Sequence, residues 1–208
     1  MIAPTVFARQ ARAGGAALVT VMFVLIAVLI VAVSAATAAL NAEKSARNER
    51  DRHIALQAAE AALADAERDI AALDPASARA AMFAPGSVLG FVDGCGQRAD
   101  DPSLGLCSRV EAPGVPAWIG AALADGGDGV PYGSFTGALM PTGAGTLPAR
   151  PPQYIIELMP FPRAGEDASE PVTNFYRVTA IGFGSRDATR VVLQSFYRKP
   201  TPSAGAAP

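Results

Sequence analysis

The sequence predicts an α+β fold in which one long N-terminal helix packs on a small antiparallel sheet. Three observations predict it. No Gly or Pro interrupts residues 16–73, the second half of that stretch carries an apolar stripe with helical spacing, and the last third of the chain contains three segments rich in β-branched and aromatic residues. The length of 208 residues suits one modest domain plus an anchor.

The first half of the expected helix is apolar. Residues 16–42 contain no charged side chain and would span about 40 Å as a helix, more than the hydrocarbon core of a bilayer. A cleaved secretory signal has a shorter apolar core, so this run predicts a membrane-spanning helix. Arg9 and Arg12 precede it within residues 1–15. Their charge places the N-terminus in the cytoplasm and the body outside the inner membrane.

Residues 43–74 continue the helix as an amphipathic stalk. The charged block at its start is interpreted as a solvated surface at the membrane interface. A packing seam follows, in which an apolar residue recurs every third or fourth position, and a coiled coil is its competing interpretation. The seam consists of Leu56, Ala59, Leu63, Ala66, Ile70 and Leu73. Asp74-Pro75 predicts the end of the helix, because a residue before proline avoids the α region.

Residues 75–153 are rich in Gly, Pro and Ala and are interpreted mainly as turns and loops, with possible short packed segments at 88–92 and 115–119. Cys95 and Cys107 lie here. An even cysteine count in an exported chain favours a disulfide between them, and two separate buried thiols are the alternative.

A glycine-rich turn containing Asp125 and Asp128 invites a calcium interpretation. The full EF-hand pattern is missing, so a plain acidic turn is preferred. We expect no metal and no cofactor.

Residues 154–198 are predicted to form the antiparallel sheet that covers the seam. Its expected strands are residues 154–158, 175–183 and 190–198, and the last two are joined by a glycine-containing hairpin loop. The Pro/Ala-rich tail, 199–208, is predicted to be disordered.

Composition and motifs argue against two function classes. With 17 basic and 19 acidic side chains and no basic patch, the chain is not expected to bind nucleic acid. G-x-S-x-G, H-E-x-x-H and P-loop patterns are absent from the sequence, and the one histidine, His53, lies on the charged stalk. A structural protein is therefore expected, with a membrane-anchored periplasmic enzyme as the alternative class.

The order of basic leader, glycine, long apolar helix and amphipathic stalk resembles type IV prepilins. The stalk sequence NERDRHIALQAAEAAL, residues 48–63, resembles the PilX family more specifically. The strings YRVTAIGFG, residues 176–184, and TRVVLQSFYR, residues 189–198, also resemble the end of PilX proteins. The resemblance implies a type IV pilin-like fold and a structural, non-enzymatic role as a minor pilin in pilus assembly.

The same resemblance implies the surroundings of the protein. It implies an inner-membrane subunit that joins a tip or priming complex of the fimbrium. The expected partners are other minor pilins, the major pilin, a pilus tip adhesin, the prepilin peptidase and the inner-membrane assembly platform. Whether the pilus serves cell adhesion, twitching motility or DNA uptake is left open. A minor pseudopilin of a type II secretion system is the alternative, although residues 75–153 lack the helical periodicity of the insertion that such proteins usually carry.

Two sites follow from the resemblance. Prepilin peptidase cuts after a glycine and methylates the new amine. The family pattern fits a cut between Gly15 and Ala16 better than one after Gly14. Major pilins carry a glutamate at the fifth position after the cut, where this chain has Thr20. Two interpretations of Thr20 stay open. It marks a subunit that sits at the filament tip, or it is simply a membrane-helix residue whose hydroxyl bonds to its own backbone.

Overall fold

A computed structural model describes residues 16–72, 76–96, 101–111, 113–120, 123, 127, 129–160 and 174–199. The chain comprises two compact units, residues 1–48 and residues 49–208. Several predicted features lie outside the described residues: the leader with Arg9, Arg12 and Gly15, the seam residue Leu73, the helix stop at residues 74–75, Asp125 with Asp128, and the tail from residue 200.

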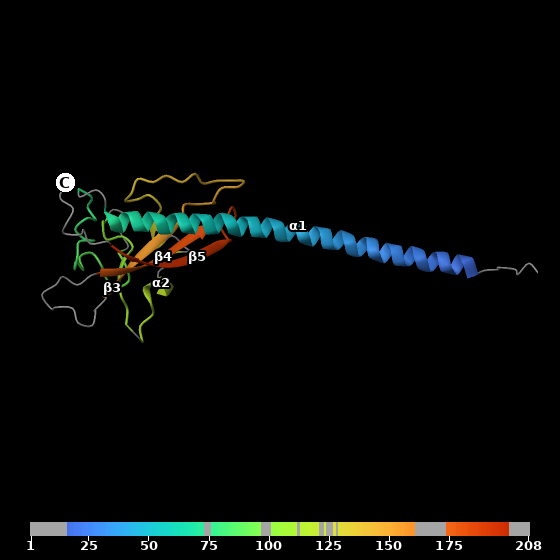
Figure 1. Cartoon of the computed structure of the whole chain (residues 1–208), viewed down its shortest axis with the longest axis horizontal. Coiled ribbons are helices and arrows are strands. Elements are labelled where there is room, and N and C mark those ends of the chain that lie inside the picture. The colour runs from blue at the N-terminus through green and yellow to red at the C-terminus, as the bar shows by residue number, and fades with distance from the viewer. Residues whose placement is uncertain are drawn as a thin grey trace, which may run out of the picture. The chain divides into compact units, whose positions relative to one another are not determined.

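Helix α1 (Ala16–Ala71) begins in the first unit and ends in the second (Figure 1). Its length follows from the uninterrupted run of helix-forming residues. It ends slightly earlier than Asp74-Pro75 predicts. Ala72 adopts a left-handed φ of 45°, and its amide donates to the carbonyls of Arg68 and Asp69. This residue closes the last turn in the position that glycine often occupies at helix ends.

The last third of the chain forms the predicted meander. Strands β3 (Gln153–Pro160), β4 (Asn174–Phe183) and β5 (Arg190–Arg198) pair antiparallel in sequence order. Two short strands from the Gly/Pro-rich region complete the sheet: β1 (Leu106–Ser108) and β2 (Val130–Pro131). Both pair with the outer side of β3, and the sheet order is β1-β3-β4-β5.

The three predicted strands pair antiparallel as expected, and the sheet gains one parallel neighbour that was not predicted. Strand β1 runs parallel to β3, so the sheet is mixed. A parallel neighbour needs a long connection, and the chain between residues 109 and 152 supplies it. The expected packed segment at 115–119 contributes a short helix, α2 (Ala117–Gly120).

Buried side chains form a cluster on each face of the sheet. The larger one packs α1 residues Ala62, Ala66 and Ile70 against side chains such as Tyr154 and Tyr176. The smaller cluster comprises Cys95, Cys107, Ala117, Leu123, Ile155, Ile181 and Phe183. Because successive side chains of a strand point to opposite faces, β3 and β4 contribute to both clusters and are buried on both sides.

The side chains of β4 that face α1 decrease in size along the strand, from Tyr176 and Val178 to Ala180 and Gly182. A Cβ atom built on Gly182 would lie 2.1 Å from the carbonyl oxygen of Ala55. The helix backbone therefore rests directly on the strand backbone at this point, and only glycine leaves the required space.

The buried face of α1 is rotated relative to the predicted seam. Ala59, Ala66 and Ile70 are buried, whereas Leu56 and Leu63 are only half-buried. The centre of the buried stripe is instead a second series with the same alternating spacing: Asp51, Ala55, Ala58, Ala62, Asp65 and Asp69. The buried centre of this face consists of alanines and aspartates, and Leu63 packs at its margin.

Candidate functional site

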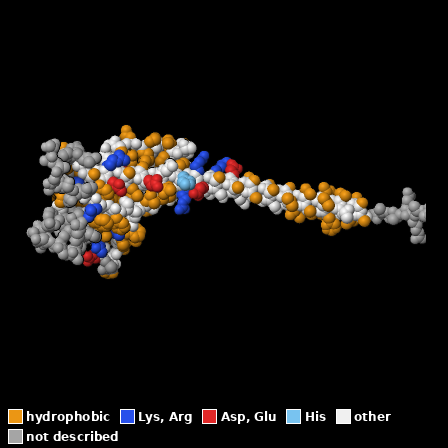
Figure 2. Space-filling model, in the orientation of Figure 1, with side chains coloured by type: hydrophobic (Ala, Val, Ile, Leu, Met, Phe, Trp, Pro, Cys, Tyr) orange, Lys and Arg blue, Asp and Glu red, His pale blue; other side chains and the backbone are white. Residues whose placement is uncertain are grey.

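The first half of α1 is a candidate membrane-spanning surface. Its apolar side chains are exposed, as Leu18 at 72% and Phe23 at 70% illustrate. The most apolar window of α1 has a mean hydropathy of 3.2, and by length and composition the helix can cross a membrane. Figure 2 shows hydrophobic side chains along this half of α1. This finding supports membrane anchoring.

Position 20 carries a hydroxyl that is bonded within its own helix. The Oγ1 atom of Thr20 donates to the carbonyl oxygen of Ala17 at 2.9 Å. Thr37 makes the same contact with the carbonyl of Ser34, also at 2.9 Å. Such bonds satisfy a hydroxyl within an apolar helix. Thr20 is neutral, so it offers no carboxylate to a positively charged group of another subunit. Ala16, the expected first residue of the mature chain, is the first residue of α1.

Asp51 fixes the hairpin between β4 and β5 to the helix. Its carboxylate accepts hydrogen bonds from the amide and hydroxyl of Ser185, at 2.6 and 2.7 Å, and from the hydroxyl of Thr189. Arg186 donates from Nε at 2.9 Å and from its backbone amide at 3.3 Å. Burial alone would raise the pKa of Asp51, but the hydrogen bonds from Thr189, Ser185 and Arg186 outweigh it and hold the pKa well below its usual range.

Asp65 lies two heptads after Asp51 and has no exposed surface. It accepts a hydrogen bond from the amide of Gly133 at 2.7 Å and another from the hydroxyl of Thr136. These donors belong to the turn that follows β2, so Asp65 holds a second segment of the body on the same face of the helix.

Asp69 is the residue of α1 that takes part in a buried polar cluster. Arg79, with no exposed surface, places Nη2 3.1 Å from its carboxylate, and the hydroxyl of Tyr154 donates to it at 3.0 Å. Nη1 of Arg79 also donates to the carbonyl of Leu104, and its guanidinium lies 4.0 Å from the ring centroid of Phe135. Burial raises the pKa of Asp69 to about 6, and the charge of Arg79 only partly offsets this effect.

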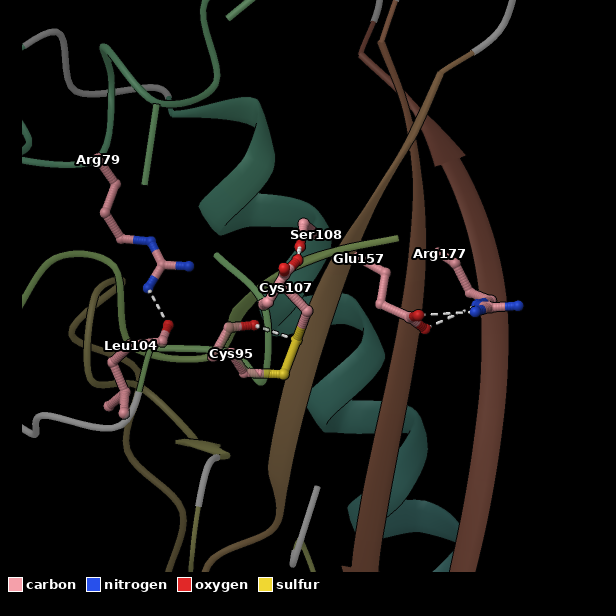
Figure 3. The surroundings of a disulfide bond; sticks show 9 residues. Arg79, Cys95, Leu104, Cys107, Ser108, Glu157 and Arg177 are labelled. Atoms are coloured by element: carbon pink, nitrogen blue, oxygen red, sulfur yellow. Dashed lines mark hydrogen bonds and ion pairs between the residues drawn. A yellow bond between two sulfur atoms is a disulfide. The ribbon is translucent and has the colours of Figure 1, made fainter. Parts of the chain in front are cut away.

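The predicted cysteine pairing is present: Cys95 and Cys107 form a disulfide (Figure 3). Cys107 lies in β1, directly opposite Glu157 of β3 in the parallel register. Glu157 is buried and accepts two hydrogen bonds from Arg177 of β4, at 2.7 and 2.6 Å. The disulfide therefore ties the loop containing Cys95 to a short strand whose neighbour is held by a bidentate ion pair.

His53 is exposed and lies 3.4 Å from Glu49 on the stalk, in agreement with a solvated histidine. Within the described residues, no group of three His, Cys, Asp or Glu side chains could hold a metal ion.

Sequence reasoning missed the three buried aspartates. Each is a charged residue within a helix, and such residues are normally exposed. A signal was nevertheless present, because all three continue the alternating spacing of Ala55, Ala58 and Ala62. Charged residues in the register of an alanine stripe indicate polar side chains that face a neighbouring segment.

The long apolar helix, the mixed sheet that covers its second half and the disulfide-closed loop define a pilin-like structural subunit. Comparison with protein families identifies it further. A model described as PilX N-terminal matches residues 13–64, and one described as Type IV pilus assembly protein PilX C-term matches residues 103–199. The chain belongs to the PilX family, a family of structural type IV pilus proteins, and this membership supports a minor pilin role. No curated protein and no solved structure matched the chain.

Proposed function

We propose that this chain is a minor pilin that is cut between Gly15 and Ala16, joins the other minor pilins at the tip of a type IV pilus and primes its assembly. Before assembly it resides in the inner membrane with its body in the periplasm. The PilX matches support a pilus rather than a secretion pseudopilus. The major pilin, a tip adhesin, the prepilin peptidase and the assembly platform are the partners that this function requires.

The observation that carries the tip position is Thr20. In a pilin filament, a carboxylate at this position of one subunit neutralises the N-terminal amine of the subunit placed before it. Thr20 is neutral, and its hydroxyl is engaged with Ala17. A charge left unpaired in apolar surroundings costs several kcal/mol. The chain would therefore add poorly beneath an existing subunit, but it loses nothing as the first subunit, which has no amine to neutralise.

A Thr20→Glu variant tests the proposal. It should fold as the unaltered protein does, because Thr20 lies in the first unit and the body has its own core. Immunogold labelling should then find it spread along pili, or initiation should be disturbed. Thr20→Gln controls for side-chain size without the charge, and Thr37→Glu controls for a charge elsewhere in the apolar helix. Unaltered protein distributed evenly along the shaft at the abundance of the major subunit would contradict a tip position.

A further inference from the structure

Strand β5 forms the edge of the sheet opposite to β1. Its nine-residue register with β4 is continuous from Arg190 to Arg198, without a bulge. On its other side no strand pairs with it among the described residues. Edge strands often carry a proline, a bulge or an inward-pointing charge, because each of these prevents pairing with other chains. Strand β5 contains no proline, and none of the side chains on its half-buried face is charged.

The backbone groups that face outward from β5 can be assigned. The amide of Gly184 donates to the carbonyl of Thr189, so this opposite pair is hydrogen-bonded. Hydrogen-bonded and non-hydrogen-bonded pairs alternate along an antiparallel ladder. Val191, Leu193, Ser195 and Tyr197 therefore bond to β4, whereas Val192, Gln194 and Phe196 direct their N–H and C=O groups to the open edge.

The side chains of the outward-directed residues form one exposed strip. Val192 and Phe196 are 56% and 57% exposed. Phe196 is held in place by a stacked ring contact with Phe175, at 5.4 Å between centroids. Arg190 and Arg198 lie at the two ends of the strip. An extended segment added at this edge would meet Val192 and Phe196 on either side of Gln194. It would meet Arg198 at one end of the strip and, at the other, Arg190, whose guanidinium lies 3.9 Å from the carboxylate of Asp187.

This charge pattern indicates which segment fits. Two copies of β5 paired antiparallel about Gln194 would place Arg190 opposite Arg198 at both ends, and like charges directly opposite each other destabilise a strand pair. We propose that the open edge of β5 binds an extended segment of another protein as an additional strand of the sheet, with apolar residues opposite Val192 and Phe196 and acidic residues at its ends. This proposal does not depend on the position of the subunit in the filament.

The experiment uses the full-length mature protein in detergent micelles and two fluorescein-labelled nine-residue peptides. The first, Glu-Thr-Val-Thr-Thr-Thr-Val-Thr-Glu, reads the same in both directions and so fits either strand orientation. The second has lysine in place of both glutamates. Fluorescence anisotropy should show saturable binding of the acidic peptide and binding of the basic peptide that is about tenfold weaker, because two attractive cross-strand pairs become repulsive.

Two matched variants test whether the backbone of β5 makes the contact. Val192→Pro removes an N–H that does not bond to β4, and Val192→Thr keeps it. The proline variant should bind the acidic peptide about tenfold more weakly than the threonine variant. Arg198→Glu should narrow or reverse the preference between the two peptides, and this arm remains informative if the proline variant fails to fold.

Four results would overturn the proposal: no saturable binding of the acidic peptide, equal binding of both peptides, no effect of Arg198→Glu on the peptide preference, or binding to Val192→Pro within twofold of Val192→Thr. The proposal would also be overturned if the edge of β5 pairs with β5 of a second copy of this chain. Disulfide-linked dimers of a Gln194→Cys variant in membranes would reveal that occupant, since two-fold pairing brings position 194 opposite itself.

Discussion

Replacing Asp51 by alanine should destabilise the body strongly. Asp51 is 3% exposed, and its carboxylate accepts hydrogen bonds from the amides of Ser185 and Arg186, from two hydroxyls and from the guanidinium of Arg186. Its removal leaves part-buried donors without an acceptor, at a cost of about 1–3 kcal/mol for a buried amide, and breaks an ion pair. We expect Asp51→Ala to lower the free energy of unfolding by about 3–4 kcal/mol.

Arg186→Ala is the matched control. The Arg186 side chain is 61% exposed, so its contribution to the ion pair with Asp51 is screened by solvent. We expect this variant to lose no more than about 1 kcal/mol. Denaturant unfolding of the full-length protein in detergent can be followed through the fluorescence of Trp118, the single tryptophan of the chain. Equal losses for the two variants, or a loss below about 1 kcal/mol for Asp51→Ala, would refute the reasoning.

The same carboxylate predicts a pH dependence. Because the folded-state pKa of Asp51 lies below its unfolded value, the native state binds this proton less tightly than the unfolded state does. The stabilisation is therefore fully present above about pH 5 and is lost as the pH falls toward the folded-state pKa. Asp51→Ala should remove this part of the acid sensitivity.

Three further predictions concern the core. Gly182→Ala should lower the free energy of unfolding by at least about 2 kcal/mol or prevent folding, because its methyl group would overlap the helix backbone. Gly94→Ala is the control: no atom lies within 4 Å of the added methyl group, so it should cost only about 1 kcal/mol for its left-handed φ. Replacing both Cys95 and Cys107 by serine should cost about 3 kcal/mol in the same unfolding assay, and a wild-type protein unaffected by reductant would contradict this. Asp69 binds its proton more tightly in the folded state, so stability should decrease as the pH rises from about 4 to about 6, and Asp69→Asn should abolish that decrease.

The strands of the meander could be predicted closely because β3, β4 and β5 are rich in β-branched and aromatic residues. The short strands could not. Strand β2 contains two residues, one of them a proline, and β1 contains three, so neither presents a periodicity to detect. Their pairing with β3 is decided by tertiary contacts and by the disulfide at Cys107.

The face of the helix was harder to predict than its existence. The leucine series starting at Leu56 and the alanine series starting at Ala55 have the same spacing, and hydrophobicity favours the leucines. The structure prefers the alanines because they let the helix backbone approach Gly182. The buried aspartates add polar contacts that a hydrophobic pattern does not register. Thr20, in contrast, could be identified from sequence alone, since its significance depends on its distance from Gly15.

The most direct test of the account is the N-terminus of the protein in sheared pili and in the inner membrane. Intact-mass measurement with N-terminal sequencing should find a mature chain that begins at Ala16 with a methylated amine, in both fractions and at low abundance in the pili. A chain that still begins at Met1, or one cut beyond residue 40 and released from the membrane, would contradict the assignment of this protein as a processed minor pilin.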